Sequence, residues 1–188
     1  MRLNIDCRRA LLLVLIGLSL VLPANQIFAQ TNSNVANVTL TANVLQSITV
    51  STAVSSVTFN VSAGSSAIGA PTVPVTTIWN VNPLTVSNVS LYGYFDSSTA
   101  ALTDGGTNNI PTAAMKASVN GAAYAAFTQT GPFGAAAASD QFFSQAITAL
   151  NATSTRSDNV TLQLDLTSLP SQPARTYTGT LHIQAQAN

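Results

Sequence analysis

Residues 175–188 read RTYTGTLHIQAQAN, and two kinds of side chain alternate strictly along this stretch. Threonine, histidine or glutamine fills the positions between a series of small or apolar residues: Tyr177, Gly179, Leu181, Ile183, Ala185 and Ala187. Successive side chains of a β-strand point to opposite faces of a sheet, so this pattern predicts a closing strand with its apolar half turned toward a core. Gly179 is expected where Trp79 or Phe59 packs closely against that strand.

The same alternation recurs along most of the chain, in short segments separated by turn residues. It is found in 35–44, 47–50, 57–61, 73–81, 88–95, 141–147 and 158–166. Asn120-Gly121 lies between two alternating arms and indicates a hairpin. Helical spacing is nearly missing, so the sequence predicts an all-β fold of about seven to ten strands, a sandwich or barrel. We expect 30–188 to form one domain.

The first 29 residues have the composition of a secretory signal peptide. Three arginines precede an apolar run, ALLLVLIGLSLVLPA, and Ala29 stands before the expected cleavage point, with Gln30 as the new N-terminus. The apolar run is shorter than the about 20 residues that a membrane-spanning helix needs. We therefore expect a secreted, extracellular or cell-surface protein, with the periplasm as an alternative, and no membrane span in the mature chain.

The composition after residue 29 excludes several classes of function. The only cysteine is Cys7, which precedes the cleavage point, so a disulfide, a thiol nucleophile and a cysteine metal site are not expected. Residues 30–188 contain five aspartates, no glutamate and three cations, Lys116, Arg156 and Arg175. Three scattered cations do not neutralise a run of phosphates, so nucleic acid is not an expected partner.

The segment DNVTLQLDLTSLPSQPARTYTGTLHIQAQA, 158–187, resembles the C-terminal part of small secreted bacterial β-sandwich proteins. These belong to the pilin-like and spore-coat-U-like group, whose last strands carry a similar Tyr-x-Gly pattern. The resemblance implies an immunoglobulin-like antiparallel β-sandwich with a structural or adhesive role outside the cell. The present chain differs from many pilins in carrying no cysteine after residue 7.

Candidate residues for catalysis or metal binding are few. His182 is the only histidine, and it is expected on the polar face of the closing strand. Asp96 and Asp104 bracket one turn-rich segment, but they match no calcium-loop spacing. We therefore predict a noncatalytic structural protein with no catalytic residue, no cofactor and no metal.

Two tyrosines form the one candidate ligand platform. Tyr92 and Tyr94 share one strand face, opposite Leu91 and Phe95. Paired aromatic rings present flat apolar faces with polar tips, which suit sugar rings. The alternative function is therefore a carbohydrate-binding module that uses Tyr92 and Tyr94, with glycans as partners.

Self-association is the other expected interaction, with further copies or with other surface proteins. Few charges protect the strand edges, which favours weak edge-to-edge pairing. We expect 35–44 to be the first strand of the protein's own sheet. The alternative is that this segment is donated as a strand to a neighbouring subunit.

Overall fold

The structure is a computed structural model that describes residues 34–188. The predicted signal peptide and its cleavage point between Ala29 and Gln30 lie outside the described residues. The chain divides into two units, Met1–Ala42 and Asn43–Asn188, and every described strand belongs to the second. No helix in 34–188 is long and apolar enough to cross a membrane.

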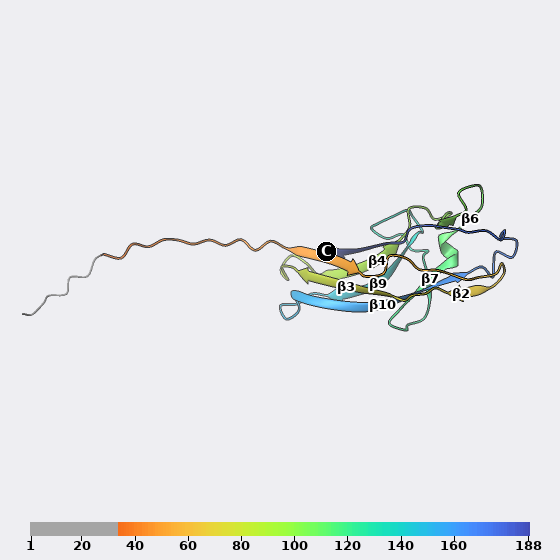
Figure 1. The fold of residues 1–188 in the computed structure, drawn as a ribbon. Helices are drawn as coiled ribbons and strands as arrows, with labels where there is room; N and C mark the ends of the chain where they lie inside the picture. The colour runs from red at the N-terminus through yellow and green to blue at the C-terminus, as the bar shows by residue number, and fades with distance from the viewer. Residues whose placement is uncertain (1–33) are drawn as a thin grey trace, which may run out of the picture. The chain divides into compact units, whose positions relative to one another are not determined.

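The larger sheet is built around β3 (Val73–Asn80) and β10 (Thr153–Asp165), which lie side by side in Figure 1. Its strand order is β1-β3-β10-β7-β8, and β2 pairs with the last residues of β10. All its pairings are antiparallel. The remaining strands of this sheet are β1 (Ser47–Thr52), β2 (Ser66–Ile68), β7 (Met115–Val119) and β8 (Ala125–Ala126).

The smaller sheet has the order β11-β4-β9 and is also antiparallel. Its strands are β4 (Asn88–Tyr94), β9 (Ser139–Ala146) and β11 (His182–Ala187). A separate pair, β5 (Leu102–Thr103) and β6 (Asn109–Ile110), precedes a 3₁₀ turn, η1 (Thr112–Ala114). Buried side chains from both main sheets join in one core, so the predicted all-β, antiparallel fold with a sandwich-like arrangement is confirmed.

Strand β3 shows how the alternation builds this core. Its inward positions and the next residue are nearly inaccessible, with exposures of 0–6%: Val73, Val75, Thr77, Trp79 and Val81. Trp79 donates its indole N–H to the carbonyl of Asn151 at 2.8 Å, which satisfies its one polar group. The predicted turn is also present, since Asn120 and Gly121 have φ values of 52° and 79° between β7 and β8.

Three predicted strand segments differ from the structure. Residues 35–44 form no strand, and the first strand begins only at Ser47. Segment 57–61 has a single bridge, between Thr58 and Ala70. The closing strand is paired only from His182, because the stretch before it has one bridge, between Thr178 and Thr103.

Gly179 has a neighbour that differs from the expected one. A Cβ atom at this position would collide with the backbone of Ala101, not with Trp79 or Phe59. The glycine therefore allows two backbones to approach each other.

Candidate functional site

A groove of about 1100 Å³ separates two long segments of the second unit. One side, which we call the first lip, runs from Val50 through 53–63. The other side, the second lip, runs through 172–183. The alternation of side chains predicts a strand in each lip, at 57–61 in the first and in 175–188 in the second.

Outside β1 and the first residues of β11, the two lips have largely unpaired backbones. Besides β1, the first lip makes one backbone bridge, in which Thr58 and Ala70 exchange hydrogen bonds of 2.8 and 3.0 Å. On the second lip, Thr178 and Thr103 exchange two bonds of 2.9 Å. Within the described part of the chain, no backbone pair joins one lip to the other. Each lip therefore resembles the exposed edge of a sheet, which is a template for a further strand.

The lips of the groove carry both apolar and polar side chains, and its floor is apolar. Half-buried residues line the two lips: Val50, Val54, Val57, Phe59 and Val61 on the first, and Tyr177, Leu181 and Ile183 on the second. The floor consists of buried core residues: Val73, Val75, Phe95, Ile110, Met115, Leu162, Leu164 and Leu166. The groove therefore lies directly over the hydrophobic core: its floor residues are at most 5% exposed, and the apolar side chains of its lips are half-buried.

The groove is almost free of charge. Arg175 is the one charged side chain among the described residues that line it, and it lies 3.6 Å from Asp104. The Asp104 carboxylate also accepts hydrogen bonds from Asn108 and from the Gly106 N–H, which hold the pKa of Asp104 below its usual range. The arrangement suits a neutral, apolar occupant and offers no pair of groups for acid–base chemistry.

The segment before β1 is the second unusual feature. Its large apolar residues are mostly in contact with solvent: Val35 (82% exposed), Val38 (80%), Leu40 (90%), Val44 (81%) and Leu45 (82%). Residues 34–46 form no helix and no paired strand. Large apolar side chains that are exposed together in this way often mark a surface that binds another protein.

Tyr92 and Tyr94 lie on the outer face of the smaller sheet, in contact with Phe133 from the loop before β9. Their ring centroids lie 5.9 and 5.8 Å from that of Phe133. Tyr94 also stacks on His182, with centroids 5.0 Å apart, and His182 Nε2 lies 3.1 Å from an oxygen of Asp96. The structure thus brings together the predicted tyrosines and the histidine.

The hydroxyl groups of both tyrosines already have partners. Tyr94 donates to Gln184 at 3.0 Å, and Tyr92 accepts from Gln141 at 3.0 Å. The cluster therefore contributes packing and hydrogen bonds to the outer face of this sheet.

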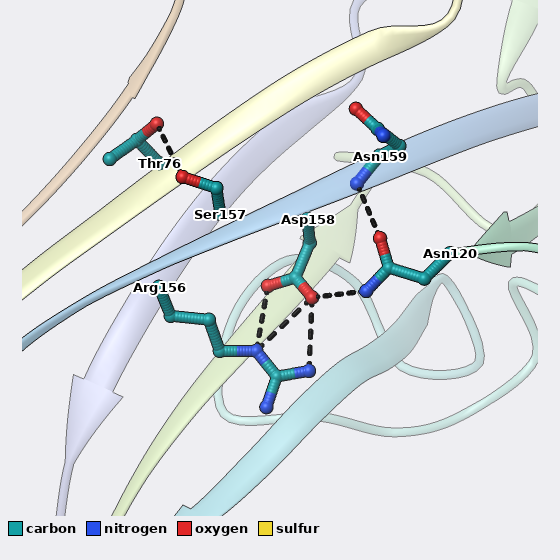
Figure 2. A network of polar contacts seen from close by, with 6 residues as sticks. All are labelled: Thr76, Asn120, Arg156, Ser157, Asp158 and Asn159. Carbon is teal, nitrogen blue, oxygen red and sulfur yellow. Dashed lines mark hydrogen bonds and ion pairs between the residues drawn. The ribbon is translucent and has the colours of Figure 1, made fainter.

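Figure 2 shows a polar network that the sequence pattern did not predict. The Asp158 carboxylate accepts from Arg156 Nε at 2.8 Å and from the Asn120 amide at 2.7 Å. Asn120 in turn accepts the N–H of Asn159 at 2.8 Å. The Arg156 guanidinium lies 4.2 Å from the centre of the Phe143 ring, on the other sheet.

This network is a structural clasp. It ties β10 to the turn after β7 and to β9, and Asp158 is only 2% exposed. In the described residues, no three histidine, aspartate or glutamate side chains gather as a metal-binding group.

Comparisons of the chain with protein-family models, with curated proteins and with solved structures found no match.

Proposed function

We propose that this protein is a secreted, noncatalytic structural subunit of a fibre or coat. Residues 36–44 of one copy, the donor segment, insert as a strand into the groove of another copy. The observation that carries the proposal is that one chain has both a groove whose two lips no described backbone pair joins and an exposed segment with alternating apolar residues. The segment can supply a strand to the groove, and the groove can bury the apolar side chains of the segment.

The side-chain pattern of the donor segment supports this pairing. One face carries Ala36, Val38, Leu40, Ala42 and Val44, and the other carries only asparagine and threonine. In strand addition, alternate side chains enter pockets while main-chain hydrogen bonds give affinity. An inserted donor would turn its apolar face toward the core and its polar face toward solvent.

Length and charge agree with the same pairing. Nine residues of extended chain span about 30 Å at about 3.3 Å per residue, and the first lip runs over a comparable stretch of chain, from Val50 to Val61. Residues 34–46 contain no charged side chain. A neutral strand therefore meets a nearly neutral groove, so insertion leaves no buried unpaired charge.

The proposed location outside the cell follows from the N-terminal composition. Removal of the first 29 residues would leave the donor segment close to a free N-terminus. A strand near a free end enters a groove without threading a loop through it.

Disulfide trapping tests the proposal, since residues 30–188 contain no cysteine. One mature protein carries Thr39→Cys on the polar face of the donor. A second carries one cysteine on the second lip, at Thr176, Thr178 or Thr180. Directly opposite residues of paired strands have Cβ atoms about 4.5–5.5 Å apart, close to disulfide geometry.

We expect a mixed disulfide dimer for at least one lip position when the two proteins are combined. The matched control is Ile78→Cys, which lies on β3 and is 48% exposed. If all lip positions cross-link no faster than this control, the donor does not occupy the groove.

The carbohydrate-binding alternative remains a prediction about Tyr92 and Tyr94. The contacts with Phe133 and His182 give these rings a packing role, and no feature of the cluster favours a sugar over it. A glycan screen of the mature protein, with the variant Tyr92→Ala/Tyr94→Ala as control, tests it. Binding that this variant loses would establish the alternative.

A further inference from the structure

At one end of the sandwich, which we call the proximal end, two tight loops lie next to the start of β1, where the chain leads back to the donor segment. The strand registers bring together the start of β1, the end of β3 and the start of β10, through Ser47, Asn80 and Thr153. The loops 81–87 and 147–152 lie side by side here, because the Val81 N–H donates to Ala152 at 2.9 Å.

Both loops are ordered by internal hydrogen bonds, yet each presents a leucine to solvent. Asn82 accepts the N–H of Leu84 at 3.0 Å, and Asn151 accepts the N–H of Thr148 at 2.7 Å. Leu84 is 91% exposed and Leu150 is 98% exposed. Gln46 reaches the first loop through Thr85 at 3.4 Å, so the chain leaves the body beside these leucines.

The groove opens toward the opposite end, which we call the distal end. Its lining begins at Val50 and stops at Ile183, so it includes neither the first residues of β1 nor the last residues of β11. Strands β1 and β11 also lie close to each other, and the residues of each that line the groove are those on its distal side. A donor strand therefore enters from the distal end, parallel to the first lip and antiparallel to the second.

The direction of the inserted strand determines where the folded sandwich of the donor copy must lie. Only Leu45 and Gln46 separate Val44 from the first residue of β1. Three Cα steps span at most about 11 Å. The proximal end of the donor copy is thereby held against the distal end of the acceptor copy.

We infer that the leucine-bearing loops of one copy, 81–87 and 147–152, pack on the distal loops 61–65 and 167–173 of the next and stiffen the joint between subunits. This inference rests on the proposed strand donation and adds a second contact to it. The two distal loops lie together, since a Cβ on Gly64 would lie 3.7 Å from Pro170. They carry the exposed Ala63 and Pro173 and the half-buried Val61 and Leu169, and neither pair of loops contains a charged residue.

The test compares three variants of the mature protein with the wild type. Leu84→Ser/Leu150→Ser removes the loop contact, and six Gly/Ser residues inserted between Gln46 and Ser47 separate the bodies. Ile78→Thr, at an exposed position of β3 outside both pairs of loops, is the matched control. Subunit exchange between labelled oligomers gives the dissociation rate, and electron microscopy of negatively stained oligomers gives their stiffness.

We expect the leucine variant and the insertion to form oligomers that exchange about tenfold faster or more and that bend more, because interface changes act mainly on dissociation. The control should match the wild type. Unchanged exchange and stiffness in both altered proteins would overturn the inference while leaving strand donation intact. Absence of wild-type oligomers, together with failure of the disulfide trap, would overturn the proposed function and this inference with it.

Discussion

Truncation of Leu40 to alanine separates the proposed role of the donor segment from a role in the protein's own fold. Leu40 is 90% exposed in the unassembled chain, so Leu40→Ala should leave the free energy of unfolding of the isolated subunit nearly unchanged. In the groove the same side chain would be buried against core residues. Leucine-to-alanine changes in cores cost about 2–5 kcal/mol, and a groove open to solvent on one side places the cost near the lower limit.

A loss of about 2–3 kcal/mol corresponds to about a 30- to 150-fold weaker subunit contact. Sedimentation velocity over a dilution series measures this change, and thermal unfolding of dilute protein checks the fold. Thr41→Ala is the matched control, since Thr41 lies on the opposite face of the donor segment. Equal weakening by both variants, or a lower unfolding temperature of the dilute Leu40→Ala protein, would refute the reasoning.

Three other predictions concern the body and the leader. Asp158→Ala should lower the free energy of unfolding by about 2–4 kcal/mol, because it leaves Arg156 without its buried partner; a shift of the urea midpoint measures this. The hydrogen bond that Lys116 donates to Asp165, at 2.6 Å, lowers the pKa of Asp165. The Asp165 carboxylate therefore stabilises the fold above its unfolded pKa of about 3.9, and this stabilisation is lost as the pH falls. Asp165→Asn should reduce the loss of stability in acid, which unfolding measured at a series of pH values checks. Intact mass of the exported protein should show cleavage near Ala29, and a full-length mass in the membrane fraction would contradict this.

The strands of the core could be predicted from the sequence because the strands that pair with them and the core that buries their apolar side chains belong to the same chain. In β3, inward residues from Val73 to Trp79 alternate with polar or half-exposed ones, and burial follows that pattern. Alternation also predicted a strand of the protein's own sheet at 35–44, and that prediction was wrong. Alternation shows that one face of a segment is apolar, but it does not show whether a strand of the same chain lies beside it.

The groove and the clasp were missed for different reasons. The groove forms because two segments far apart in the sequence lie opposite each other without pairing, and no local sequence pattern predicts that arrangement. The clasp left a local signal, since Arg156 and Asp158 precede Val160 and Leu162 on one face of β10. Two opposite charges at alternate positions of an otherwise inward face indicate an ion pair that is shielded from water.

If subunits join by the proposed strand donation, the polarity of the groove gives the growing assembly two chemically different tips. One tip ends in a vacant groove and the other in an unused donor segment, so each new subunit adds in a single orientation. A synthetic peptide with the sequence of 34–46 would occupy the vacant groove and act as a chain stopper at that tip alone. Sub-stoichiometric amounts of such a peptide would shorten the polymers without changing their thickness, which offers a way to set their length.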